Sequence, residues 1–384
     1  MDWKNFFKIN SVRNISFIGV ANIGGNAISA IFWLYLASLL GSENYGELSY
    51  LLGIGSIATA VSLFGSEQAI TVYSAKKINI HPPIYFISLL TSASSALILY
   101  FMFDSPGLSL FVIGYVVYAL VLAETLGLKL YKNYSINYIL QKILFVIFSL
   151  ILYFILGPDG ILLGYGLSML FLIKRIYNSL TKNKIDFSLL RQKSRFIIHN
   201  YILDISRVSK GQIDKILIGP LFGFSLLGNY FLALQILSVL SIFPGIITKY
   251  TLPEDASGNS TKKIKLITAG FSVVLSLLGI FVAPYFLPVF FPEFSDAVEF
   301  LPLVSISLIP STISSLYISK LLGMELSNYV VYGYLISLTA SIIGILTLGE
   351  IWGIPGLAIS LVLSSSFQAI FFFIVDHFYL KKNN

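Results

Sequence analysis

The chain has 384 residues, of which 56% are hydrophobic and only 11% are charged, with a formal net charge of +7 at pH 7. Soluble domains carry roughly 25% charged residues, so this composition excludes a water-soluble fold and indicates an integral membrane protein. The sequence has no cysteine and three histidines, which excludes disulfides and thiolate metal sites. No catalytic residue, metal site or cofactor is predicted.

Apolar stretches follow one another along the chain between short polar connectors. A helix needs about 20 apolar residues to cross the hydrocarbon core, so we expect an all-α integral membrane fold with about twelve transmembrane helices. Six are predicted in the first half, at Ile15–Leu40, Leu48–Tyr73, Ile84–Phe103, Leu108–Leu128, Ile139–Leu156 and Ile161–Ile176. Six more are predicted at Phe196–Gly219, Phe224–Thr248, Ile264–Phe291, Phe300–Leu322, Tyr329–Leu348 and Pro355–Phe378. A polar linker, 179–195, then separates an N-terminal bundle, 1–178, from a C-terminal bundle, 196–384.

The charges in the connectors predict the orientation, because Lys and Arg concentrate in cytoplasmic loops. With both termini in the cytoplasm, all but three of the 25 basic residues fall in the tails, the cytoplasmic connectors and the adjoining helix ends. The opposite connectors carry only acidic charges, namely Glu43, Glu47, Asp104, Asp159, Glu293, Asp296, Glu299 and Glu350. We therefore expect a multi-pass protein of the cell inner or plasma membrane with both termini cytoplasmic.

The two halves share glycine motifs. Gly41-Ser-Glu-Asn-Tyr-Gly46 follows the first predicted span, and Gly223-Phe-Ser-Leu-Leu-Gly228 follows the seventh with the same spacing. Glycine-rich segments also precede the sixth and twelfth spans. Six spans per half is an even number, so both halves begin on the same side of the membrane. This pattern predicts two six-helix bundles related by a parallel pseudo-two-fold axis, facing a central cavity.

The seventh predicted span carries charges inside the membrane. At 100° per residue, one face of this helix holds Asp204, Arg207, Lys210, Asp214 and Lys215. A charge at the bilayer centre costs roughly 2.5 kcal/mol or more, so such side chains face a bundle interior or a cavity and indicate function. Pairing along the helix is the alternative. Because the five charges sum to +1, we predict a binding site for an anionic substrate such as a pyrophosphate.

The first half contributes isolated polar residues within its spans, namely Asn22, Asn26, Glu67, Gln68 and Glu124. A buried carboxylate can exchange a proton near neutral pH, so the two glutamates are candidates for coupling transport to a proton or a sodium ion. Pairing with cations near helix ends is the alternative. The two asparagines lie one helical turn apart, and they are candidates for lining a cavity or for hydrogen bonds between helices.

Four segments carry a family pattern: Leu39-Leu-Gly-Ser-Glu-Asn-Tyr-Gly-Glu-Leu-Ser-Tyr50, Phe64-Gly-Ser-Glu-Gln-Ala-Ile-Thr-Val-Tyr-Ser-Ala-Lys76, Gln212-Ile-Asp-Lys-Ile-Leu-Ile-Gly219 and Leu227-Gly-Asn-Tyr-Phe-Leu-Ala-Leu-Gln-Ile236. In order and spacing they resemble the multidrug, oligosaccharidyl-lipid and polysaccharide exporter (MOP) superfamily. Within it, they resemble the Wzx-type polysaccharide flippases of O-antigen and capsule repeat units. By this resemblance Asp214 fits the acidic position of the seventh span, and Tyr230 and Gln235 fit the start of the eighth.

The resemblance implies a V-shaped two-bundle fold that works by alternating access. Its substrate would be a polyprenyl-pyrophosphate-linked oligosaccharide, moved from the inner to the outer leaflet for surface polysaccharide biosynthesis. Expected partners are this lipid-linked oligosaccharide and membrane lipids, with no nucleic acid. The chain is expected to act as a monomer near polysaccharide biosynthesis enzymes.

Two other functions stay open. A multidrug or toxic-compound antiporter of the same fold would export an organic cation. Many drug exporters of this superfamily hold the coupling ion with an Asp in helix 1, but residues 14–42 carry no charge. A membrane glycan polymerase or ligase would need a sizeable outer loop with catalytic residues, whereas the predicted outer connectors are short. The sequence therefore favours a transporter over an enzyme and a flippase over a drug antiporter.

Overall fold

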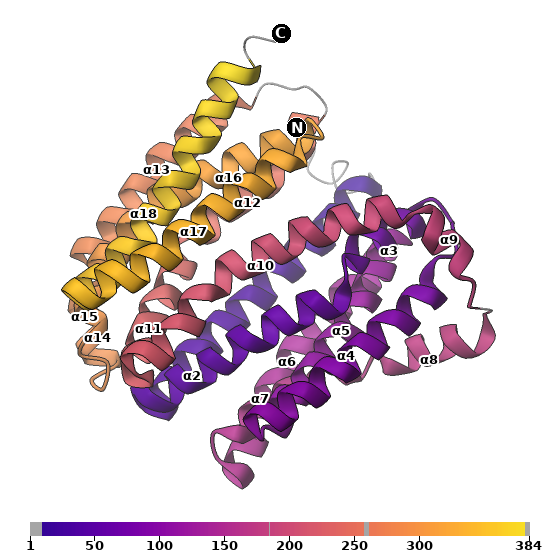
Figure 1. Cartoon of the computed structure of the whole chain (residues 1–384), viewed down its shortest axis with the longest axis horizontal. Helices are drawn as coiled ribbons and strands as arrows, with labels where there is room; N and C mark the ends of the chain where they lie inside the picture. Colours follow the sequence, from indigo (N-terminus) through magenta and orange to yellow (C-terminus); the bar gives the residue numbers. More distant parts are fainter. Residues whose placement is uncertain (1–9, 184, 257–260, 381–384) are drawn as a thin grey trace. The chain divides into compact units, whose positions relative to one another are not determined.

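The computed structural model describes residues 10–183, 185–256 and 261–380. The terminal segments, 1–9 and 381–384, whose lysines entered the predicted orientation, lie outside the described residues. The described residues form helices and no strand (Figure 1), which confirms the all-α prediction for this part of the chain. The helices of the first half are α2 (Asn10–Leu63), α3 (Ser66–Ala75), α4 (His81–Phe103), α5 (Pro106–Gly127), α6 (Tyr131–Leu156), α7 (Asp159–Leu170), α8 (Ile173–Lys182) and α9 (Phe187–Gln192). Those of the second half are α10 (Ser194–Phe222), α11 (Phe224–Leu240), α12 (Ile242–Ala256), α13 (Lys262–Phe281), α14 (Ala283–Phe290), α15 (Ala297–Ile306), α16 (Leu308–Gly323), α17 (Ser327–Trp352), α18 (Ile354–Ile374) and the π-helix η1 (Val375–Leu380).

Many of these helices have the length and composition of membrane spans. Among the described residues, seven helices are long and apolar enough to cross a membrane, and the number rises to ten if each of three bent helix pairs is one span. Lipid hydrocarbon offers no hydrogen-bond partners, so a spanning segment must satisfy its backbone internally, as a helix does. The chain is therefore a helical multi-pass membrane protein.

Proline accounts for two of the bends that interrupt the predicted spans. The axes of α11 and α12 differ by 52°, and those of α15 and α16 by 42°. Pro244 lacks the N–H that would bond to the carbonyl of Leu240, the last residue of α11. Pro310 stands in the same relation to Ile306, the last residue of α15. Without these bonds the helices break at the residues between them.

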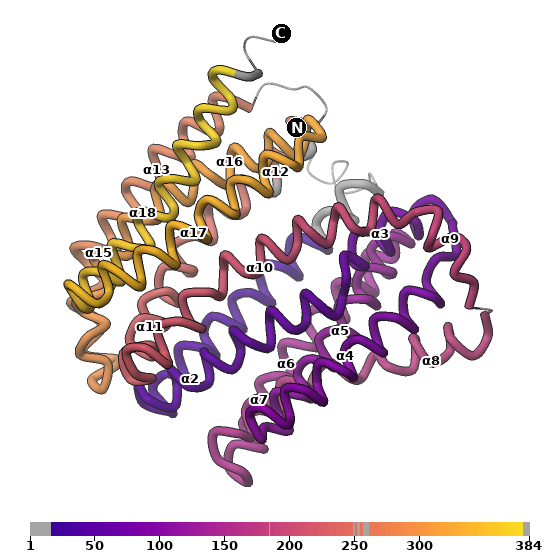
Figure 2. Tube along the Cα trace, in the orientation of Figure 1, coloured from indigo at the N-terminus to yellow at the C-terminus, as the bar shows by residue number. Residues whose placement is uncertain are grey.

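The chain forms two compact units that do not coincide with its two halves. The first unit comprises Met1–Phe32 and Ile54–Ile205, and the second comprises Trp33–Gly53 and Ser206–Asn384. Each of α2 and α10 (both traced in Figure 2) therefore contributes to both units. In the first unit α5 packs against α3, α4 and α7. In the second unit α17 packs along α18, and α16 contacts α12, α13 and α18.

Two glycine turns of matching sequence adopt matching conformations in the second unit. Gly41 interrupts α2 with φ 71° and ψ 173°, and Gly223 separates α10 from α11 with φ 99° and ψ 152°. A residue with a Cβ is disfavoured at such positive φ values, whereas glycine adopts them readily. The motifs 41–46 and 223–228 therefore correspond in local backbone structure as well as in sequence.

The helices after these two turns touch backbone to backbone. A Cβ on Gly46 would lie 1.8 Å from the carbonyl oxygen of Phe224, and a Cβ on Gly228 would lie 1.8 Å from that of Ser42. Each glycine thus meets the residue four positions before the other, so the contact is reciprocal. The hydroxyls of Ser42 and Ser225, 2.9 Å apart, form a hydrogen bond at the same place. Small residues allow this close approach, as in many membrane helix pairs.

We expect Gly46→Ala and Gly228→Ala each to destabilise the protein by about 2 kcal/mol or more, because the added methyl group forces two backbones apart. Gly270→Ala in α13 is the matched control, since a Cβ there meets no atom within 4 Å. The control should keep or slightly raise the midpoint of thermal unfolding in detergent, because alanine favours a helix interior over glycine. Equal midpoints for Gly46→Ala and Gly270→Ala would contradict the close contact.

Candidate functional site

Three of the five charges predicted on one face of the seventh span make hydrogen bonds within the second unit. Lys210 Nζ donates to Gln368 Oε1 at 2.9 Å, which joins α10 to α18. Asp214 is buried, and its Oδ2 accepts from the Tyr230 hydroxyl of α11 at 2.9 Å. Its Oδ1 accepts from the backbone N–H of Lys215 at 2.8 Å. We call these five residues the α10 cluster.

The lysines of the α10 cluster are held by neutral groups. Lys215 Nζ donates to Gln212 Oε1 at 2.7 Å and lies 5.3 Å from the centre of the Phe231 ring, a cation–π distance. Among the described residues, neither Lys210 nor Lys215 has a carboxylate within 4 Å of its ammonium group. Two ammonium groups and one carboxylate leave this cluster a net charge of +1. It can therefore attract an anion without first losing an ion pair.

The other residues predicted for this site are distributed over both units. Asp204 is half-buried in the part of α10 that belongs to the first unit, and Arg207 is exposed in the part that belongs to the second. Gln235 is half-buried on α11, one helical turn after Phe231. Of the residues named for the family resemblance, the structure brings Asp214 and Tyr230 into direct contact.

A second polar group lies in the first unit, between α2 and α6. The Tyr138 hydroxyl donates to Asn26 Oδ1 at 2.8 Å, and the Asn22 amide, which donates to the backbone carbonyl of Ile18 at 2.8 Å, lies close to Tyr134. The rings of Tyr134 and Tyr138 stack with centres 6.1 Å apart, and Lys142 Nζ lies 5.4 Å from the centre of the Tyr138 ring. We call these five side chains the α6 cluster. It combines one cation with amide and phenol groups.

The sequence analysis missed the three α6 members of this cluster, although a signal was present. Tyr134, Tyr138 and Lys142 are spaced four residues apart, so they share one face of the helix. The predicted orientation counts Lys142 among the basic residues at helix ends, but Lys142 lies in the middle of the 26-residue α6. A lysine at that depth is subject to the same cost as the charges of α10.

The predicted coupling residues occupy different surroundings within the first unit. Glu67, half-buried in α3, lies close enough to Tyr134 of the α6 cluster to interact with it electrostatically. Gln68 beside it is exposed. Glu124 Oε2 instead accepts from the Tyr85 hydroxyl at 2.9 Å and pairs with Arg175 Nε at 2.7 Å. Glu124 thus has the cationic partner that the sequence analysis left open as an alternative.

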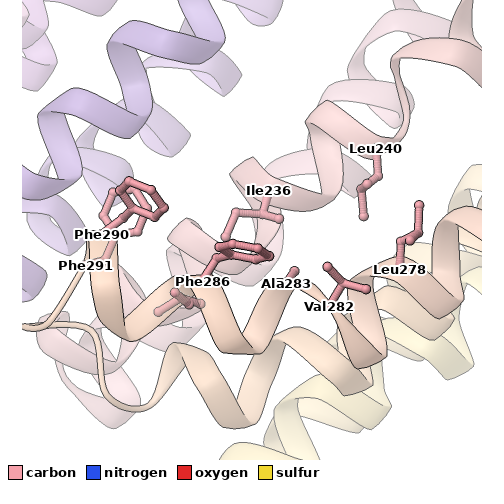
Figure 3. Close-up of a pocket in the computed structure, with 9 residues that line it drawn as sticks. Ile236, Leu240, Leu278, Val282, Ala283, Phe286, Phe290 and Phe291 are labelled. Atoms are coloured by element: carbon pink, nitrogen blue, oxygen red, sulfur yellow. The ribbon is translucent and has the colours of Figure 1, made fainter.

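The second unit also holds an apolar cavity of about 350 Å³, formed by α11, α13 and α14 (Figure 3). Figure 3 shows only hydrocarbon side chains around it. They are Ile236, Leu240, Leu278, Val282, Ala283, Phe286, Leu287, Phe290 and Phe291. A cavity of this composition cannot stabilise a charged group, so it suits hydrocarbon.

Within the described residues, no group of three or more His, Cys, Asp or Glu side chains could hold a metal ion.

Comparison with known proteins defines the class of fold. The chain matches the lipid II flippase MurJ in an inward closed conformation with a TM-score of 0.71 and 13% identity, covering 95% of this chain and 88% of that chain. It matches an inward-facing multidrug resistance MATE family transporter of the MOP superfamily with a TM-score of 0.65 and 13% identity, covering 93% and 95%. It matches the eukaryotic MATE transporter AtDTX14 with a TM-score of 0.60 and 17% identity, covering 96% of both chains. The protein therefore has the fold of the MATE and MurJ transporters.

Sequence comparison gives one relative of similar length. An uncharacterized membrane protein of Methanocaldococcus jannaschii is 26% identical over 396 aligned positions, covering 91% of this chain and 94% of the relative. No family model matches the sequence. The fold agrees with the resemblance at the level of the MOP superfamily.

The contact between Asp214 and Tyr230 predicts energetic coupling. Tyr230→Phe removes a donor from a buried carboxylate and should cost about 1–3 kcal/mol of stability. Asp214→Ala/Tyr230→Phe should cost less than the sum of its single changes, because each single change removes the same hydrogen bond. Unfolding of the purified protein in detergent measures all three, with Tyr285→Phe on the exposed face of α14 as the control. Strictly additive costs would show that the two residues act independently.

Proposed function

We propose that this protein is a flippase that moves a polyprenyl-pyrophosphate-linked oligosaccharide from the inner to the outer leaflet by alternating access. The surface polysaccharide pathway would supply and use this substrate. The observation that carries the proposal is the presence of a lysine-containing polar cluster in each unit, on α6 in the first and on α10 in the second. When the head of the substrate leaves water, it needs charged and hydrogen-bonding groups of the protein around it. The polyprenyl tail needs none.

Each cluster, taken by itself, carries groups that suit part of that head. Ammonium groups such as Lys142 and Lys210 suit the oxygens of a pyrophosphate, and hydrogen bonds to charged groups are among the stronger ones. Amides and phenols such as Asn26 and Tyr138 suit sugar hydroxyls, which both donate and accept. Among the described residues, neither lysine forms an ion pair within 4 Å, so each could exchange its present neutral contacts for the substrate.

Structural similarity supports two substrate classes. The similarity to MurJ, a lipid II flippase, favours a lipid-linked anion, whereas the similarity to multidrug resistance MATE transporters favours an organic cation. The part of α2 before Gly41 carries Asn22 and Asn26, which have no charge. Their neutrality favours the lipid-linked anion over the organic cation. Lysines in both clusters would also repel a cation. We therefore keep drug export as the second candidate and prefer the flippase.

We further propose twelve spans in two six-helix bundles related by a parallel pseudo-two-fold axis, with both termini cytoplasmic. Ten spans follow from length and hydropathy. The long helix α2 contains a break at Gly41, so it supplies two spans. Helix α10 has 29 residues, about 43 Å at 1.5 Å per residue, which is long enough to cross despite its charges. The reciprocal contact of Gly46 and Gly228 supports the repeat.

Cysteine labelling tests this topology directly, because the chain has no cysteine. Ser295→Cys should react with an impermeant maleimide on intact cells, because Ser295 is exposed in an acidic connector predicted to face outward. Ser188→Cys, exposed on α9 in the basic linker, should react only after the membrane is permeabilised. Labelling of Ser188→Cys in intact cells would overturn the proposed orientation.

Transport itself is tested with purified protein in liposomes that contain a labelled polyprenyl-pyrophosphate disaccharide. Access of an external glycosidase to the sugar should rise well above that in empty liposomes. Lys142→Met and Lys210→Met should each slow this rise about tenfold, because each loses a charge-assisted contact of about 1.5 kcal/mol or more. Lys132→Met, exposed on the same helix as Lys142, should leave the rate unchanged.

The same liposomes separate the two candidate functions. If glycosidase access does not rise while a fluorescent organic cation is transported, the drug-export function replaces the flippase. If access rises but Lys142→Met and Lys210→Met behave like Lys132→Met, the substrate does not use the two clusters.

A further inference from the structure

A cavity of about 650 Å³ with charged residues in its lining lies in the second unit, at the ends of α12, α16 and α18 and the start of α13. It is nearly twice the volume of the apolar cavity of Figure 3. Besides Tyr317, its ionisable lining residues are Asp255, Lys262, Lys265, Lys320, Asp376 and His377. None of them belongs to the α10 cluster, so the cavity is a separate feature of this unit.

The lining of this cavity changes from ionic to apolar along its helices. On α13, Lys262 and Lys265 precede Ala269 by one to two turns, and all three line the cavity. On α16, which runs toward the same end, Leu316 precedes Lys320 by one turn. The ionic end coincides with the end that the loop charges predict to be cytoplasmic. The cavity is therefore amphipathic, with its charges at the predicted membrane surface.

Both oxygens of the Asp255 carboxylate accept hydrogen bonds. An anion that enters the cavity therefore does not meet an unpaired carboxylate. Asp255 Oδ2 accepts from Lys265 Nζ at 2.6 Å and from Ser319 Oγ at 2.8 Å, and its Oδ1 accepts from Thr261 Oγ1. Thr261 occupies the N-cap position of α13, and its side chain makes no capping hydrogen bond there. The uncapped N–H groups of a helix N-terminus attract anions.

The remaining charges leave the cavity positive. Lys320 pairs with Asp376, as Lys265 does with Asp255. Lys262 makes no ion pair among the described residues, so the ionic end carries a net charge of +1 with His377 neutral. His377 sits on the π-helical turn η1 beside this end, and π-turns are frequent at functional sites.

We propose that this cavity binds the phosphate-bearing head group of an anionic phospholipid from the cytoplasmic leaflet. A phosphodiester carries one negative charge, which matches the excess charge of the ionic end. The first carbons of an acyl chain would cover the apolar end, which a free phosphate would leave empty. Basic pockets between membrane helices on the cytoplasmic side bind anionic lipids in this way. The site is separate from the α6 and α10 clusters, so its lipid is a bound component and not the transported substrate.

Native mass spectrometry of the full-length protein in a neutral detergent tests this site. Phosphatidylglycerol should bind more tightly than phosphatidylcholine to the wild-type protein. Lys262→Gln should weaken binding of phosphatidylglycerol about fivefold, the effect of removing one lysine near an anionic lipid. Lys263→Gln is the matched control, because Lys263 is exposed beside Lys262 but does not line the cavity, and it should bind as the wild type does.

Each other outcome overturns the proposal. The wild-type protein could bind phosphatidylglycerol and phosphatidylcholine equally, or Lys262→Gln and Lys263→Gln could lose equal affinity. Either result would mean that lipids bind only as a general belt around the protein. Displacement of phosphatidylglycerol by inorganic phosphate at equal concentration would mean a site for a free anion. Size-exclusion profiles that match the wild type establish that each variant is folded. None of these readouts depends on transport, so failure here leaves the flippase proposal untouched.

Discussion

The structure depends on one constraint: a polar group inside hydrocarbon must find its partner within the protein. Helix α10 meets this constraint with neutral partners on other helices, since Lys210 donates to Gln368 and Asp214 accepts from Tyr230. These bonds join α10 to α18 and to α11, so the placement of the charges also determines which helices of the second unit lie together. Because buried charges are costly without partners, their burial favours the one helix packing that supplies those partners.

The two polar clusters solve this problem in a similar way. Each holds lysine with amides and aromatic rings, and among the described residues its lysines form no ion pair within 4 Å, whereas Glu124 and Asp255 are held in ion pairs. An ion pair fixes structure but leaves no net charge for a ligand. A lysine held by a ring or an amide is stabilised and still attractive to an anion. This difference separates the candidate transport residues from the structural ones.

Glycine supplies the complementary constraint of space. The matching turns at Gly41 and Gly223 place Gly46 and Gly228 where the two helices meet, and the contact leaves no room for a Cβ. Because the same motif serves both sides, the contact is symmetric at the level of single residues. A repeat in sequence therefore becomes a repeat in local packing, which explains why its spacing is identical in the two halves.

The sequence by itself determined the helical class, the membrane location and the charged face of α10, because composition and helical periodicity are local properties. It also identified Asp214 and Tyr230, although not their contact. Only the tertiary structure decided the partners: Lys210 and Gln368 are 158 residues apart, and Asn26 and Tyr138 are 112 apart. Periodicity indicates which face of a helix is polar, but the group that meets that face depends on how distant helices pack. The tertiary structure also decided the position of Lys142 in the middle of α6 and the division of α2 and α10 between two units.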